Sequence, residues 1–161
     1  PIGAGRARAL AERAQEIQRG GAGRTISVAT LAERMRMDEP HLELIIGSIE
    51  KLVAEELASA AQALMVLSDG EASGVSALTT ITAGRSELVR FFLLCVNDPH
   101  PAPVVIDTLQ ALGGMLQPEA MPDDCDDRNL PGYLAETALR LACRGFSVER
   151  IQPVIDALAA C

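Results

Sequence analysis

A long apolar stripe constrains this chain more than any other feature of its sequence. From Leu42 to Leu67 the apolar residues recur at the three- and four-residue spacing of one helix face, and the pattern continues through Gly47. The segment "SDGEASG" then interrupts it. The spacing predicts one long helix near the middle of the chain. Its apolar positions are Leu42, Ile45, Ile46, Ile49, Leu52, Val53, Leu57, Ala60, Leu64 and Leu67.

Aromatic side chains are scarce, which narrows the fold class further. The chain has 161 residues, of which 48% are apolar, but aromatic residues make up only 2% and Trp is missing. A core of this composition is built from Leu, Ile, Val, Ala and Met, which favours packed helices over a sheet sandwich. The length also suffices to bury such a core without metals or disulfides. We therefore predict an all-α protein, either a helical bundle or a short stack of helix pairs, with six to eight helices and one long central helix.

Three other segments have recognisable patterns. Residues 5–19 have helical apolar spacing and end at a glycine-rich stretch. Residues 85–97 are apolar nearly all round from Leu88 to Val96, which predicts a central buried helix. Residues 74–84, "GVSALTTITAG", are ambiguous, because their β-branched residues weaken a helix. We interpret this last segment as a frayed helix or a packed irregular stretch, with a short strand as the alternative.

Proline, glycine and serine mark the ends of the later helices. Pro103 should open a helix that Gly113 and Gly114 close. A further helix should end at Gly145, and Ser147 should cap the last helix.

Charge is distributed unevenly along the chain. Residues 1–37 carry seven Arg against three Glu, a balance of +4, whereas residues 38–161 carry seven basic and 19 acidic residues, a balance of −12. This divides the chain into a basic N-terminal helical segment, 1–37, and an acidic all-α body, 38–161. We expect the two to pack into one compact domain. The basic segment suits nucleic acid, an acidic partner or the chain's own body.

Three stretches of the chain resemble one another coarsely: residues 31–52, 93–112 and 141–161. Each has the pattern of a helix end, a turn with Pro or Gly, and a second helix, and Cys95 and Cys143 occupy matching places. One interpretation is a repeat of stacked helix pairs. The other is that helix pairs rich in Leu and Ala look alike without being a repeat.

Residues 26–45, "ISVATLAERMRMDEPHLELI", have the pattern of two helices joined by a tight turn. The small residue Ala32 falls at the helix contact, Met37 falls in the turn, and Leu42 and Ile45 fall on the buried side of the second helix. Over these 20 residues, about an eighth of the chain, the sequence resembles the helix-turn-helix of DNA-binding regulators. The resemblance implies a DNA-binding N-terminal part and a C-terminal part that dimerises or senses a signal.

Two features of this stretch disfavour DNA. Arg36 stands at the turn position where that family usually has Gly. The would-be recognition helix begins "DEPHLE", whose carboxylates repel phosphates and leave only His41 as a donor. A helix pair with a solvated acidic face, or one that meets a protein, fits the same residues. The candidates for contact with nucleic acid or an acidic partner are Arg6, Arg13, Arg34, Arg36 and His41.

The chain lacks a recognisable catalytic or metal-binding motif. It contains no HExxH, GxSxG, P-loop or CxxC pattern, and His41 and His100 each stand beside a proline. Cys95 and Cys143 are expected to be small core residues. Cys125 lies among aspartates, which disfavour its thiolate, and their spacing is not that of a calcium loop. We predict no catalytic residue, no cofactor site and no metal site.

These observations favour a non-enzymatic protein-interaction module, such as an adaptor, a regulatory subunit or a partner-binding domain. We expect another protein or a second copy of the chain as partner, no membrane, and a cytoplasmic location with reduced thiols. The alternative is a helix-turn-helix DNA-binding regulator. A third interpretation is a ligand-binding domain with its pocket between the helices of Phe91 and Val105. The expected partner-helix face consists of Leu42, Ile45, Ile49, Leu52 and Leu64.

Overall fold

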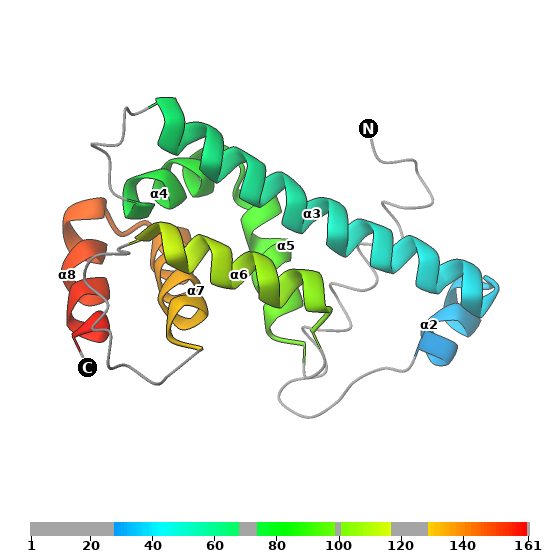
Figure 1. The fold of residues 1–161 in the computed structure, drawn as a ribbon. Coiled ribbons are helices and arrows are strands. Elements are labelled where there is room, and N and C mark those ends of the chain that lie inside the picture. Colours follow the sequence, from blue (N-terminus) through cyan, green and yellow to red (C-terminus); the bar gives the residue numbers. More distant parts are fainter. Residues whose placement is uncertain (1–27, 68–73, 99–100, 117–128, 161) are drawn as a thin grey trace.

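The computed structural model describes residues 28–67, 74–98, 101–116 and 129–160, and this part of the chain forms helices and turns only. The all-α prediction is confirmed (Figure 1). The predicted helix over residues 5–19 and the aspartate-rich segment around Cys125 lie outside the described residues. The helices are α2 (Val28–Met35), α3 (Glu39–Leu67), α4 (Gly74–Gly84), α5 (Ser86–Val96), α6 (Pro103–Leu116), α7 (Leu130–Cys143) and α8 (Val148–Ala159).

Helix α3 is the long element of the fold. It has 29 residues and continues through Gly47, as its apolar stripe predicts. It crosses the bundle above α4, α5 and α6 and packs on all three (Figure 1). Helix α2 packs against the N-terminal end of α3, at the opposite end of the molecule from α8. This contact joins the end of the basic segment, 1–37, to the start of the acidic body, 38–161.

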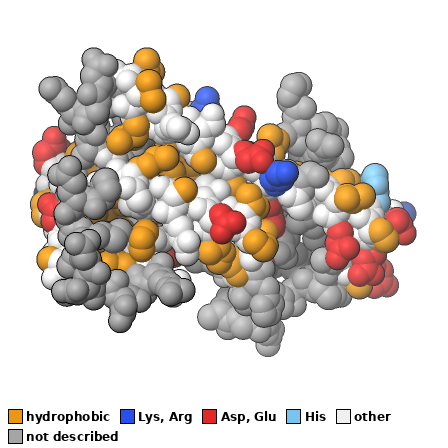
Figure 2. Space-filling model, in the orientation of Figure 1, with side chains coloured by type: hydrophobic (Ala, Val, Ile, Leu, Met, Phe, Trp, Pro, Cys, Tyr) orange, Lys and Arg blue, Asp and Glu red, His pale blue; other side chains and the backbone are white. Residues whose placement is uncertain are grey.

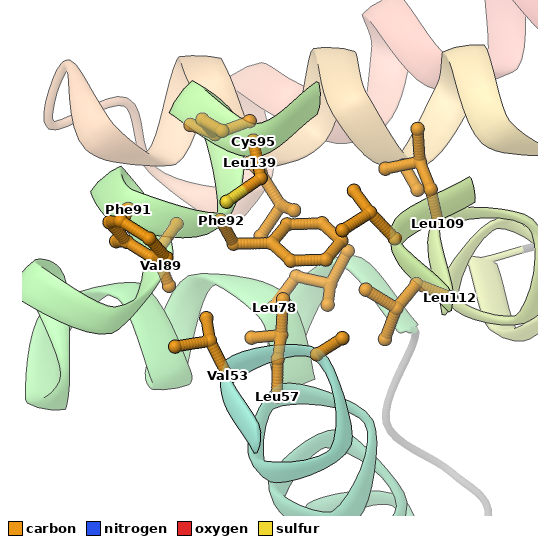
Figure 3. Close-up of a cluster of buried hydrophobic side chains, with 14 of the residues drawn as sticks. Val53, Leu57, Leu78, Val89, Phe91, Phe92, Cys95, Leu109, Leu112 and Leu139 are labelled. Atoms are coloured by element: carbon orange, nitrogen blue, oxygen red, sulfur yellow. The ribbon is translucent and has the colours of Figure 1, made fainter. Parts of the chain in front are cut away.

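The core gathers where α3, α4, α5, α6 and α7 meet. Phe92 of α5 is 1% exposed, and its ring points into a cluster of aliphatic side chains (Figure 3). Burying one such ring contributes about 1.5–3 kcal/mol. The prediction of a buried α5 is confirmed, because its buried residues include Val89, Phe91, Phe92, Leu93 and Cys95. The aliphatic neighbours drawn around Phe92 include Val53, Leu57, Leu78, Leu109, Leu112 and Leu139.

The ambiguous segment is a helix, α4, and the strand alternative is wrong. Each of three threonine hydroxyls donates a hydrogen bond to the carbonyl four residues earlier: Thr79 to Val75, Thr80 to Ser76 and Thr82 to Leu78. This pattern lets threonine sit in a helix without leaving its hydroxyl unpaired.

Helices α6 and α7 approach each other more closely than any sequence pattern indicated. Gly113 and Gly114 do not close α6, which continues to Leu116. A Cβ on Gly113 would overlap the backbone of Pro131 in α7. Gly113 is therefore a site of helix–helix contact and not a helix stop, because the missing side chain lets the backbones meet.

The chain turns sharply between α7 and α8. Gly145 has a φ of 85°, and the Phe146 N–H donates to the Leu141 carbonyl at 3.2 Å. This left-handed glycine ends α7 as predicted. Ser147 stands at the N-cap position of α8, but its side chain makes no capping hydrogen bond.

Candidate functional site

The turn between α2 and α3 has the geometry expected of a tight helix pair. Arg36 lies in the left-handed region with a φ of 52°. Its N–H donates to the Glu33 carbonyl at 3.1 Å, and the Met37 N–H donates to the Ala32 carbonyl at 2.9 Å. These two bonds form the helix C-terminal motif that most often contains glycine. The residue that departs from the helix-turn-helix pattern thus adopts the conformation for which the pattern uses glycine.

The packing of this helix pair follows the predicted positions. Ala32 and Met35 of α2 are buried, Leu42 of α3 is fully buried, and Met37 is half-buried against the same core. The Leu42 N–H donates to the Asp38 carbonyl at 2.9 Å, which starts α3. The predicted helix pair and its tight turn are therefore present.

The α7–α8 turn repeats the α2–α3 turn. Gly145 takes the place of Arg36, and Ser147 takes the place of Asp38. The Ile151 N–H donates to the Ser147 carbonyl at 3.0 Å, as Leu42 donates to Asp38. Leu42 and Ile151 are both fully buried. The first and third similar stretches share this turn, whereas the second connects α5 to α6 over the longer segment 97–102.

The surface of the α2–α3 turn is mainly acidic. Asp38, Glu39 and Glu43 are exposed beside the exposed candidates Arg36 and His41. Figure 2 shows acidic side chains gathered over this end of the molecule. Arg6 and Arg13 lie outside the described residues, and so does the side chain of Arg34, although Arg34 belongs to α2. Of the five candidate contact residues, the structure thus places Arg36 and His41 on one exposed surface, next to three carboxylates.

The expected partner-helix face is largely used by the protein itself. Leu42 and Ile49 are buried in the core, and Ile45 and Leu64 are half-buried against it. Only Leu52 is exposed, at 39%. Four of the five residues are thus covered at least in part, because most of the stripe packs on the chain's own helices.

Three apolar residues of α3 lie outside the expected partner-helix face and are strongly exposed. Leu44, Val66 and Leu67 are 70%, 71% and 79% exposed. Leu67 belongs to the apolar stripe of α3 but not to the expected partner-helix face. Leu44 and Val66 belong to neither. The available signal was that apolar residues of α3 also occur off the stripe.

A groove of about 310 Å³ lies between α3 and α4, close to the C-terminal end of α3. Hydrophobic side chains are gathered toward this end of the face drawn in Figure 2. Val66 and Leu67 follow two groove residues, Ala63 and Leu64, by three residues in α3, so they lie next to them on the same side of the helix. We name the groove and these two residues the α3 surface. Its members are Ala60, Ala63, Leu64, Val66 and Leu67 of α3, and Thr80, Ile81, Gly84 and Arg85 at the end of α4.

A second cavity, of about 360 Å³, lies where the α4–α5 corner faces the α7–α8 turn. We name it the corner cavity. Phe91 and Val105, expected to flank a pocket, are instead buried in the core. The corner cavity is lined by Thr79, Thr82, Ala83, Ser86, Arg90, Ala142, Cys143, Gly145, Phe146 and Ser147.

The two described cysteines have different environments. Cys95 is buried, as predicted, whereas Cys143 is half-buried and lines the corner cavity. Burial raises the pKa of the Cys143 thiol, and the guanidinium groups of Arg90 and Arg140 partly oppose this rise. The neutral thiol is therefore favoured, which makes Cys143 a weak nucleophile.

Among the residues that the structure describes, no three His, Cys, Asp or Glu side chains gather as metal ligands would. Nor does any helix of this part of the chain have the length and apolar character to cross a membrane. Comparisons with family models, curated proteins and solved structures found no match for the chain.

Proposed function

We propose that the protein is an interaction module that binds another protein, or a second copy of itself, through the α3 surface. The observation that carries this proposal is the exposure of Val66 and Leu67, at 71% and 79%, beside an apolar groove. Single exposed apolar residues are common in proteins. Two large ones that adjoin a groove form a continuous surface, which is the usual character of a contact site.

The shape and charge of the α3 surface suit an amphipathic helix. The groove is lined by small residues, Ala60, Ala63 and Gly84, which let a partner backbone approach closely. Arg85 makes no ion pair among the described residues and stands at the groove. A partner helix with an apolar face and a carboxylate near Arg85 would match both features. Burying Val66 and Leu67 would contribute about 1.5–3 kcal/mol each.

The test compares two double variants of equal charge. Val66→Lys with Leu67→Lys places two ammonium groups in the α3 surface, and Gln110→Lys with Ala111→Lys places them on exposed positions of α6. We expect the first variant to lose the self-association or the partner complex of the wild-type chain, and the second to retain it. Equal behaviour of the two variants, or a wild-type chain that forms no complex, would overturn the proposal.

DNA binding is a second candidate, which the α2–α3 turn geometry favours and the exposed Asp38, Glu39 and Glu43 disfavour. The test is binding of labelled duplex DNA across a salt series that begins at low salt. Binding that weakens steeply with salt, and that is lost in Arg34→Glu with Arg36→Glu, would support it. The absence of binding at low salt would remove it.

A further inference from the structure

The corner cavity combines a position, a size and a lining that suit a small ligand. Its volume of about 360 Å³ lies in the lower part of the range of ligand pockets. Two separate parts of the chain form its walls: the end of α4 with the start of α5, and the turn from α7 into α8. Phe146 supplies an apolar wall, and Thr82, Ser86 and Ser147 supply hydroxyl groups.

Arg90 is the charged residue of this lining, and it has no partner in the described part of the chain. No hydrogen bond or ion pair joins it to another described residue. Arg140 differs, because it donates to Glu136 at 2.7 Å and also to Asn97. A guanidinium that lines a cavity without a carboxylate is available to an anion, with which it forms strong charge-assisted hydrogen bonds.

The surroundings of the cavity add to the positive potential. Arg144 and Arg150 line an adjoining hollow that shares Gly145, Phe146 and Ser147 with the corner cavity. Glu87 and Glu149 stand in the first turns of α5 and α8, but neither lines either hollow. This concentration of arginines contrasts with the net charge of −8 of the whole chain.

Two serine hydroxyl groups add further hydrogen-bond donors to the lining of the corner cavity. The side chains of Ser86 and Ser147 make no hydrogen bond to another described residue, so both are able to donate to a ligand. The hydroxyls of Thr79 and Thr82 are already used within α4. Arg90 and Ser86 of α5 and Ser147 of the α7–α8 turn therefore form a set of donors from two separate parts of the chain around one cavity.

We propose that the corner cavity binds a small ligand through a compact oxyanion, such as a phosphate group, held by Arg90 with Ser86 and Ser147. The site is separate from the α3 surface, so the proposal does not depend on the proposed function. Phe146 would contact an apolar part of the same ligand.

The experiment titrates the full chain with inorganic phosphate and pyrophosphate at constant ionic strength and follows the backbone amides by NMR. We expect saturable shifts at Arg90, Gly145 and Ser147. Arg90→Gln should weaken binding about tenfold or more, the loss expected for a charge-assisted hydrogen bond. Arg85→Gln is the matched control, because Arg85 is exposed on the same corner and has no ion pair with another described residue, but lines the groove of the α3 surface instead of the corner cavity. It should leave binding unchanged.

A second measurement uses Cys143, which lines the same cavity. Alkylation by iodoacetamide, followed on the Cys143 peptide by mass spectrometry, should slow when pyrophosphate is added to the wild-type chain and not when it is added to Arg90→Gln. Shifts that do not saturate, or that Arg85→Gln reduces as much as Arg90→Gln, would overturn the proposal. So would duplex DNA that shifts the same amides at lower concentration than pyrophosphate, because the cavity would then belong to a nucleic-acid interface.

Discussion

Gly113 of α6 lies directly against the backbone of Pro131 of α7, with no room for a Cβ between them. The neighbouring residue, Gly114, is exposed and has no atom within 4 Å of the position that its Cβ would take. Gly113→Ala should therefore lower the free energy of unfolding by about 3 kcal/mol or more, because α6 and α7 must move apart. Urea unfolding followed by circular dichroism measures this loss.

Gly114→Ala is the matched control for that prediction. Its alanine is in open space within a helix, so it should raise the free energy of unfolding by about 0.5–1 kcal/mol. A similar effect of the two substitutions would show that the close approach of α6 and α7 is not a feature of the folded protein.

Substitutions of the left-handed residue in the two similar turns should change stability in opposite directions. Arg36→Gly should stabilise the protein by about 0.5–1 kcal/mol, because glycine accepts a φ of 52° without the strain of an L side chain. Gly145→Ala should destabilise it by about 1 kcal/mol, because alanine must adopt a φ of 85°. Thermal unfolding of both variants checks the pair, and a destabilising Arg36→Gly would mean that the Arg36 side chain holds the turn by a contact of its own.

The free energy of unfolding should depend on pH through the thiol of Cys143. Burial raises the pKa of the Cys143 thiol, so the folded state holds this proton more tightly than the unfolded state does. The contribution of the proton to stability is fully present below the unfolded thiol pKa and is lost as the pH rises through the folded pKa. The free energy of unfolding of the wild type should therefore fall more at alkaline pH than that of Cys143→Ala. Parallel curves for the two proteins over this range would contradict the assignment.

Arg90 should also affect the reactivity of Cys143. Its guanidinium lowers the thiol pKa and partly offsets burial, so Arg90→Gln should slow alkylation of Cys143 at a fixed pH near 8 when no anion is added. The rate is read from the Cys143 peptide by mass spectrometry. Faster alkylation in the variant would mean that Arg90 shields the thiol sterically instead of acting through its charge.

The elements that periodicity and end signals define were predicted well. The stripe located α3, the apolar run located α5, and Gly145 marked the end of α7. The helix α4 was ambiguous because the propensity of its threonines is weak, and only their bonds to the preceding turn resolve it. Gly113 was misread because a glycine that stops a helix and one that admits a neighbouring helix look alike in sequence.

The candidate sites were harder to predict because they depend on which faces meet. The stripe of α3 identified an apolar face, but whether that face packs inward is decided by helices far along the chain. Arg90 and Cys143 come together only through the packing of α5 on α7, so no local pattern joins them. The sequence shows that Arg36 departs from the helix-turn-helix pattern, but only the structure shows its left-handed conformation.

The most direct test of the interaction proposal is photo-cross-linking from the α3 surface in cells of the source organism. A benzophenone amino acid at Val66 should form an adduct with one partner chain or with a second copy, identified by mass spectrometry. The same amino acid at Gln110, an exposed position of α6, is the control. A specific adduct from Val66 and none from Gln110 is the predicted result. No adduct from Val66 above the level at Gln110 would contradict the proposal that the α3 surface is where this protein binds its partner.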